Sequence, residues 1–230
     1  MDELANNLME ELNCETVFTI PIGDGIPIGE SVVVTWIIMA VLVIPSIIFV
    51  RNLKVENPGK PQIILETVIG FFYDFFHGIL GEKGKRYIPY LITVILYIGL
   101  ANIFGIFGFK PPTKDLNVTV ALSVMSIVLI EYAHIHAKGF KQRMKDFAAP
   151  IAVVAPINFL ELFIRPLSLC MRLFGNVLGS YVVMELIKLV VPVFIPVILS
   201  LYFDIFDGFI QAYVFVFLTS LFVAEGIEDE

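Results

Sequence analysis

Arg172 is the residue whose chemistry most needs an explanation, because it lies in the middle of a hydrophobic stretch. An arginine does not lose its proton inside a protein, and holding its charge at membrane depth costs about 2.5–3.5 kcal/mol on insertion scales. A chain keeps such a residue where it meets a counter-charge or a water-filled path, which makes Arg172 a candidate functional residue. The alternative is an arginine near a helix end, whose apolar stem lets the guanidinium reach the lipid headgroups.

The helix face around Arg172 predicts close approach of another helix. Residues three, four and seven positions apart share a helix face, and on this face they are Ser168, Gly175, Asn176 and Gly179. Two small residues four positions apart let a second helix approach closely. We therefore expect this face to be a docking groove that contains a cation.

No carboxylate that is close in the sequence can neutralise Arg172. Glu161 and Arg165 are four residues apart and can pair with each other. Along a helix, Glu161 lies about 16 Å from Arg172 and Glu185 about 20 Å, which is too far for contact. We expect the carboxylate that faces Arg172 to come from the facing helix or from another chain. Glu185 could pair with Lys188 at a helix end or line a water-filled path.

A second polar line follows nearer the C-terminus, at Asp204, Asp207, Gly208 and Gln211. At helical spacing these residues share a face, and buried between helices they could carry water and relay protons through the carboxylates. The alternative is that Asp204 and Asp207 lie at a helix start and interact favourably with its dipole. Gln211 lies deeper, although a hydrogen bond between helices would also satisfy it.

The composition is that of a membrane protein that crosses the bilayer several times. Of the 230 residues, 58% are hydrophobic and 16% are charged, whereas soluble domains carry about 25% charged residues. The net charge of −7 argues against a nucleic-acid partner. The sequence contains no glycine-rich phosphate-binding motif, so we expect no nucleotide site and no enzyme activity of the chain by itself.

The residues that could bind a metal or form a disulfide are not arranged to do so. Cys14 lies in a polar segment and Cys170 in an apolar helix, and neither has a second Cys or His at metal-site spacing. His134 and His136 are two residues apart and point to opposite faces of a helix. We expect no metal site and no other cofactor.

Apolar runs of about 20 residues predict an all-α fold, with ordinary spans over residues 31–50, 87–107 and 116–137. Residues 63–80 are apolar but carry a polar line at nearly helical spacing, and basic loops lie on both sides of them. Because short basic loops stay on the cytoplasmic side, we expect this segment to be an amphipathic helix along the membrane surface. Residues 1–30, with seven acidic and no basic side chains, are expected to form an acidic extracytoplasmic segment.

The last third of the chain predicts two helices that are longer than the membrane is thick. Residues 158–188 and 196–223 would reach about 46 and 42 Å, against about 30 Å of hydrocarbon. Either these helices are broken, with Pro166 as the obvious place, or they are steeply slanted. We favour a slanted hairpin. The count is then about five crossings plus one surface helix, in a single membrane domain of residues 31–230 with a cytoplasmic C-terminus.

Three motifs in this sequence resemble subunit a of the rotary F-type ATP synthases. They are residues 165–176 (RPLSLCMRLFGN), 211–219 (QAYVFVFLT) and the turn 112–119 (PTKDLNVT). They occur in the family's order, and the resemblance spans most of the chain from the first span onward. It implies a surface helix and a slanted two-helix hairpin that lies against a rotating ring of c subunits.

The resemblance also implies roles for single residues. Arg172 corresponds to the essential arginine that faces the ring carboxylate, Asn176 and Gln211 to polar residues of the outer half-channel, and Asp115 to a position near its mouth. The chain departs from the family's pattern at three positions. Tyr181 stands where relatives often carry Glu or His, so Glu185 could substitute; Asp204 stands where His or Glu is frequent; and Asn158 stands where relatives tend to have an acid, so Glu161 could serve the inner half-channel.

The function implied is that of the stator subunit, which passes H⁺ or Na⁺ through two offset half-channels to and from the ring carboxylates. The expected partners are the c-ring, the peripheral-stalk b subunits and the lipid bilayer, in a plasma membrane of the bacterial type. Ser168 and Asp207 complete the set of expected ion-pathway residues. The rival function is a secondary ion-coupled transporter with its own midplane substrate site. Such folds usually show internal repeats, and we find none in this sequence.

Overall fold

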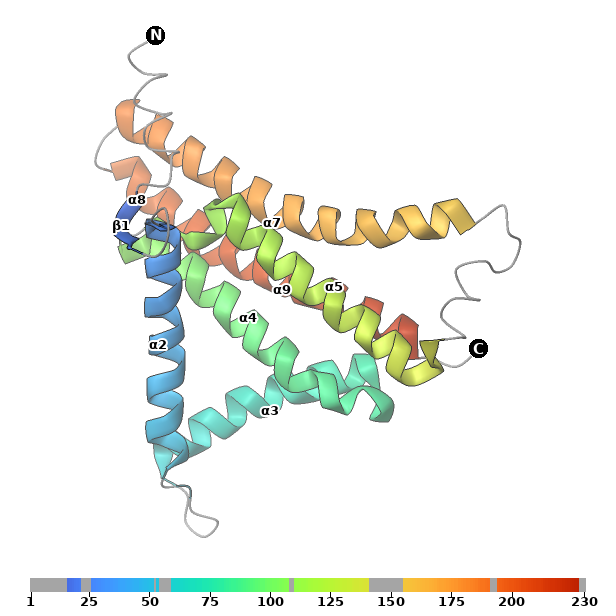
Figure 1. Ribbon diagram of the computed structural model, residues 1–230. Helices are drawn as coiled ribbons and strands as arrows, with labels where there is room; N and C mark the ends of the chain where they lie inside the picture. The colour runs from blue at the N-terminus through green and yellow to red at the C-terminus, as the bar shows by residue number, and fades with distance from the viewer. Residues whose placement is uncertain are drawn as a thin grey trace. The chain divides into compact units, whose positions relative to one another are not determined.

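The computed structural model describes residues 16–21, 26–51, 53, 59–107, 110–140, 155–190 and 194–227, most of which are helical (Figure 1). The α-helices are α2 (Glu30–Val50), α3 (Lys60–Leu80), α4 (Ile88–Ile103), α5 (Leu116–Lys138), α7 (Ala155–Val190), α8 (Phe194–Ser200) and α9 (Gly208–Ile227). Three 3₁₀ turns adjoin them, η1 (Glu82–Tyr87), η2 (Phe104–Phe107) and η3 (Pro112–Lys114). The segment η5 (Leu201–Asp207) between α8 and α9 is a π-helix.

Six helical segments of the described chain are long and apolar enough to cross a membrane. They are Glu30–Val50, Lys60–Leu80, Glu82–Ile106, Leu116–Lys138, Leu160–Lys188 and Ile198–Ile227. The expectation of an all-α membrane protein with several spans is confirmed. Because Lys60–Leu80 meets the same criteria of length and composition, its place along the membrane surface stays a prediction.

Two short strands lie within the segment for which only an acidic tail was predicted. β1 (Thr16–Ile20) pairs antiparallel with β2 (Ile26–Gly29), and their register shifts between Thr16 and Phe18. β1 has the sequence TVFTI, which is rich in the β-branched and aromatic residues that favour strands. This pairing was not predicted, because runs of four or five residues give a weak signal beside apolar runs of about 20.

The two long C-terminal helices differ in how well they match the prediction. α7 continues through Pro166 as one helix of 36 residues, so the alternative of a break at this proline is wrong. The second helix is continuous in its backbone, but residues 201–207 are π-helical. Hydrogen bonds in a π-helix run from residue i to i+5, so the α-helical spacing that grouped Asp204 with Asp207 does not hold there.

By its internal contacts the chain divides into two compact units. The first consists of Met1–Val43, Tyr97–Thr119 and Arg172–Ala212. Its apolar core joins α2 to α4 through the buried residues Val34, Ile38 and Ala101. Next to this core, the hydroxyl groups of Thr35 and Tyr97 are 3.1 Å apart, so the same two helices also share a polar contact.

The second unit consists of Ile44–Leu96, Val120–Met171 and Tyr213–Glu230. Phe75 of α3 packs against the rings of Tyr213 and Phe217 of α9, at centroid distances of 5.8 and 6.4 Å. The Nε2 atom of His134 in α5 lies 3.1 Å from the carbonyl oxygen of Phe222 in α9. Helix α9 is therefore held to α3 by aromatic packing and to α5 by a polar contact.

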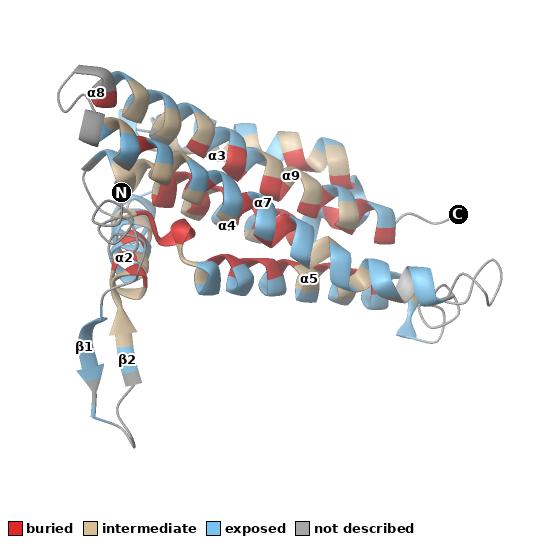
Figure 2. Cartoon of the chain, turned by 90° about the horizontal axis from the view of Figure 1, so that it is seen from above, coloured by how far each residue is buried: buried red, intermediate tan, exposed pale blue. Residues whose placement is uncertain are grey.

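Helix α5 shows how the apolar side chains are distributed in this unit (Figure 2). Its buried side includes Leu122, Ser126 and Ile130, while Val128 is 62% exposed and Met125 is 53% exposed. Large exposed apolar surfaces are unfavourable in water. They are expected of helices that lie against hydrocarbon, so the burial pattern agrees with a membrane protein.

Replacing Gly226 with alanine should destabilise the protein, because a Cβ at this position would overlap the buried ring of His134. We expect a loss of about 1–3 kcal/mol, as for other overpacked cores, measured by thermal unfolding of the purified protein in detergent. Gly78→Ala is the matched control, since nothing lies within 4 Å of a Cβ there. Equal unfolding temperatures for G226A and the unchanged protein would contradict the packing described.

Candidate functional site

Helix α7 is divided between the two units, and Arg172 is the first residue of the part that belongs to the first unit. Gly175, Asn176 and Gly179, which share its helix face, are exposed like Arg172 itself. A Cβ added to either glycine would meet no atom within 4 Å. Within the described part of the chain, Arg172 forms no ion pair. This face therefore presents an uncompensated positive charge beside two positions without side chains.

Asp207 connects the end of the π-helix to α7 and α9. Its Oδ1 accepts a hydrogen bond from Nε2 of Gln211, at 3.2 Å, and its Oδ2 accepts one from the hydroxyl of Ser180, at 3.4 Å. Gln211 is buried. We call Ser180, Asp207 and Gln211 the Asp207 group. The structure thus brings together two of the predicted pathway residues, Asp207 and Gln211, and adds Ser180.

Asn102 is a buried polar residue that was not predicted from the sequence to belong to the site. Its Nδ2 donates to the carbonyl oxygen of Gly208 at 3.0 Å, and its Oδ1 accepts from the hydroxyl of Thr113 at 2.8 Å. A Cβ at Gly208 would lie 2.7 Å from Cβ of Asn102. The close approach requires glycine and fixes the start of α9 against α4. The available signal was a single amide within the apolar run LANIF.

Asp115 caps the N-terminus of α5. Its Oδ1 accepts from the backbone N–H of Asn117 at 2.9 Å, the bond typical of an N-cap aspartate. Its Oδ2 accepts from the hydroxyl of Ser31 at 2.6 Å, which joins this cap to the start of α2. The structure therefore gives Asp115 a stabilising role, and its place near the mouth of an ion pathway stays a prediction.

Two lysines of the adjoining turn interact within the same unit. The ammonium of the buried Lys114 lies 4.0 Å from the ring centre of Tyr181, within the range of a cation–π interaction. Lys110 Nζ lies 3.8 Å from a carboxylate oxygen of Glu30. Tyr181, which replaces the Glu or His expected from the resemblance, thus faces a cation.

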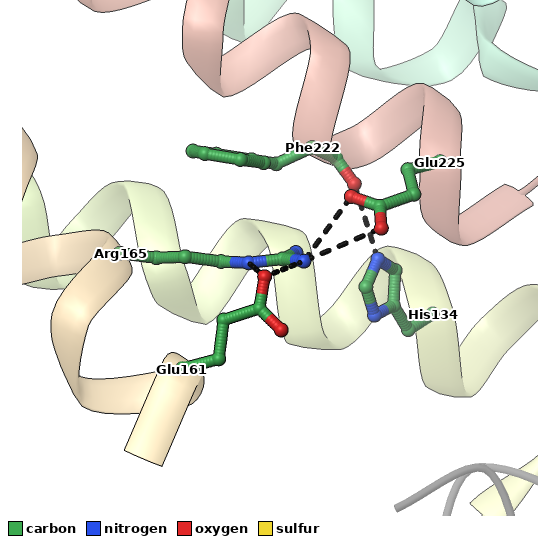
Figure 3. A network of polar contacts seen from close by, with 5 residues as sticks. All are labelled: His134, Glu161, Arg165, Phe222 and Glu225. Atoms are coloured by element: carbon green, nitrogen blue, oxygen red, sulfur yellow. Dashed lines mark hydrogen bonds and ion pairs between the residues drawn. The ribbon is translucent and has the colours of Figure 1, made fainter. Parts of the chain in front are cut away.

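A second polar cluster lies in the second unit and joins α5, α7 and α9 (Figure 3). Nη2 of Arg165 lies 2.8 Å from Oε1 of Glu161 and 3.2 Å from Oε2 of Glu225, and the guanidinium carbon lies 4.6 Å from the ring centre of Phe222. The side chain of Arg165 is 15% exposed, against 52% for Glu161 and 62% for Glu225. We call Glu161, Arg165 and Glu225 the Arg165 group.

The Arg165 group contains one more carboxylate than the pair of Glu161 and Arg165 that was predicted from the sequence. The pairing of Glu161 with Arg165 was expected from their spacing, and the structure shows it. Glu225 was missed, because nothing in the local sequence near the C-terminus marks it as a partner of residue 165. With two carboxylates around one guanidinium, the three side chains carry a net charge of −1 when all are ionised.

The remaining predicted residues are placed only in part. Ser168 is exposed on the second unit's part of α7. Glu185 and Asp204 lie in helical backbone, and Asn158 near the start of α7, but the side chains of these three fall outside the described residues. Across the residues that the structure describes, no three or more His, Cys, Asp or Glu side chains are grouped so that they could hold a metal ion.

Comparison with known proteins identifies the family. The sequence model of the ATP synthase A chain family matches residues 32–224. The chain belongs to this family. It is 36% identical to ATP synthase subunit a of Moorella thermoacetica over 88% of this chain and 92% of the relative. It is 33% identical to the sodium ion specific subunit a of Propionigenium modestum over 89% of this chain and 76% of the relative.

Family membership decides between the two functions considered above. The ATP synthase A chain is an ion-translocating membrane subunit and not a catalytic one. The resemblance is therefore confirmed, and the secondary transporter is not favoured. A third relative, subunit a of Geotalea daltonii, is 34% identical over 91% of this chain and 92% of the relative, so the similarity extends over nearly the whole length.

Substitutions of Asp115 should separate its capping role from its charge. Asp115→Ala should lower the free energy of unfolding by about 1 kcal/mol, the usual cost of losing an N-cap. Asp115→Asn should keep most of that stability, because asparagine accepts the same backbone hydrogen bond. Thermal unfolding of the purified complex tests this. If Asn destabilised the protein as much as Ala, the cap would not explain the role of this residue.

Proposed function

We propose that this chain is the stator subunit a that guides ions to and from the carboxylates of a rotating c-ring, through two half-channels separated by Arg172. The observation that carries the proposal is Arg172 itself, an exposed cation without an ion pair among the described residues, in a hydrophobic stretch of α7. Family membership supplies the context in which such a charge has a use.

The outer half-channel is assigned to residues of the first unit. We place Asn176, Asp204, Asp207, Gln211 and Glu185 along it, with Asp115 near its mouth. The hydrogen bonds from Ser180 and Gln211 to Asp207 support this assignment, because they show that polar groups of α7 and α9 meet inside an apolar segment. Such groups can hold water where hydrocarbon cannot.

The inner half-channel is assigned to residues of the second unit, Glu161 with Ser168 and the newly found Glu225. The two carboxylates of the Arg165 group are more than half exposed, and their excess negative charge attracts a cation that leaves the ring. Arg165 keeps the two carboxylates close together despite their repulsion.

Arg172 has two tasks in this scheme. A ring carboxylate that has bound an ion is neutral and can rotate through lipid. When it returns to Arg172, the permanent positive charge favours the ionised carboxylate, so the ion is released. The same charge repels cations and prevents direct leakage between the half-channels. Each charge that moves down 100 mV releases about 2.3 kcal/mol, so several ions must cross for each ATP that the separate catalytic sector makes.

The finer assignments follow from the same scheme. We propose the c-ring and the peripheral-stalk b subunits as partners and a bacterial plasma membrane as the location. The N-terminus is then outside and the C-terminus cytoplasmic. Both H⁺ and Na⁺ fit a pathway of carboxylate, amide and hydroxyl groups, and one relative is named as sodium ion specific.

Replacing Arg172 with alanine should abolish coupled ATP synthesis by the assembled complex, because returning ring carboxylates would keep their ions. The measurement is the ATP synthesis rate in reconstituted vesicles under an imposed ion gradient. Arg51→Ala is the matched control, since it removes the same charge from an exposed position after α2. A wild-type rate with R172A would refute the scheme.

A further inference from the structure

Asp207 carries a carboxylate inside an apolar segment, and its hydrogen-bond partners are neutral. It lies within the candidate span Ile198–Ile227. The two partners are the amide of Gln211 and the hydroxyl of Ser180. Across the described chain, no lysine, arginine or histidine forms an ion pair with Asp207. Among the described residues, its negative charge is therefore not compensated by an ion pair.

Neutral partners of this kind can accommodate a carboxylate both with and without a bound cation. The ionised form accepts from Gln211 and Ser180, as the structure shows. In the protonated form, Oδ1 can still accept from the amide, while the new O–H can donate to the oxygen of Ser180, because a hydroxyl both donates and accepts. Neither state loses its hydrogen bonds, which is what transient binding requires.

Two other acids that were predicted to line the ion pathway have different partners. Asp115 accepts from the backbone N–H of Asn117, a donor that cannot accept a hydrogen bond in return. Glu161 is paired with Arg165 at 2.8 Å. Asp207 differs from both because its partners are the amide of Gln211 and the hydroxyl of Ser180.

The backbone around Asp207 is shaped and held in place. Asp207 ends the π-helix, and short π-helical segments frequently occur at functional sites. The next residue, Gly208, is fixed to Asn102 by the 3.0 Å hydrogen bond and by a contact that leaves no room for a side chain. The position of the carboxylate between α7 and α9 is therefore set by three helices.

We propose that Asp207 is the residue that binds the transported cation in transit through the outer half-channel, with Ser180 as its positioning residue. This inference rests on the proposed function. For a proton, hydronium transfers H⁺ to an Asp207 oxygen and leaves as water. The neutral acid then gives the same proton to a water molecule on the ring side, which passes it to a ring carboxylate, and Asp207 returns to its ionised form. For Na⁺, the same oxygen replaces a hydration water and then releases the ion.

The test compares Asp207→Asn with Asp207→Glu in the complete complex. Asparagine can still accept from Gln211 and contact Ser180 but cannot bind a proton, whereas glutamate keeps the carboxylate. Complexes in vesicles are stripped of the catalytic sector, and conduction is measured with a pH-sensitive dye for H⁺ and with radioactive Na⁺. Rates are divided by the amount of assembled membrane sector. Asp74→Asn, which neutralises an exposed acid on α3, is the matched control.

We expect D207N to conduct the transported ion about 100-fold more slowly than the wild type, at the low end of the losses seen for acid–base groups, and D207E and D74N to retain most of the rate. Ser180→Ala should have a smaller effect than D207N, because it removes one partner and leaves the carboxylate. Wild-type conduction by D207N, or equal losses in D207N and D207E, would overturn the proposal.

Two further variants are measured beside D207N and D207E. If D207N does not assemble, Asp207→Ser takes its place, since serine is smaller and can still form hydrogen bonds. The R172A complex, with Asp207 unchanged, reports on the proposed function separately. Loss of ATP synthesis in R172A together with normal conduction in D207N would leave the stator function standing and remove the role of Asp207.

Discussion

A polar group inside a membrane-spanning helix must find its hydrogen-bond partner within the protein, because hydrocarbon supplies none. The contacts of Asn102 with Gly208 and of His134 with Phe222 satisfy this requirement. Both join helices that are distant in the sequence, so pairing the polar groups also determines which helices pack together. In this chain the polar residues therefore help to determine which helices pack together.

The two arginines of α7 show how the same side chain acquires different uses. Arg165 is held by two carboxylates and an aromatic ring, and its charge is compensated within the protein. Arg172 has no such ion pair among the described residues. In the proposed function, its charge is available to a carboxylate of the c-ring. The distinction comes from the neighbouring residues and not from the arginines themselves.

The sequence predicted those features that depend on local signals. The limits of α2 and α5 lie close to the predicted ones, because a long apolar run between polar segments permits few alternatives. The family was recognisable because its motifs are local runs of residues. The exposed face with Arg172 and Asn176 followed from helical periodicity alone.

The features that were missed depend on contacts between distant segments. Asn102 reaches Gly208 across 106 positions and Arg165 reaches Glu225 across 60, and no local pattern reports such distances. The π-helix at 201–207 was missed because periodicity assumes one helix type throughout. The grouping of the acids beyond Ser200 was therefore the weakest part of the prediction.

Pro166 lies within α7 without interrupting it. Because proline has no N–H, the carbonyl oxygen of Leu162, four residues earlier, lacks the amide hydrogen that a regular helix would provide. That oxygen is an acceptor for water next to Glu161 and Arg165 in the sequence. The proline thus leaves one backbone carbonyl of the helix able to accept a hydrogen bond from water within a largely apolar segment.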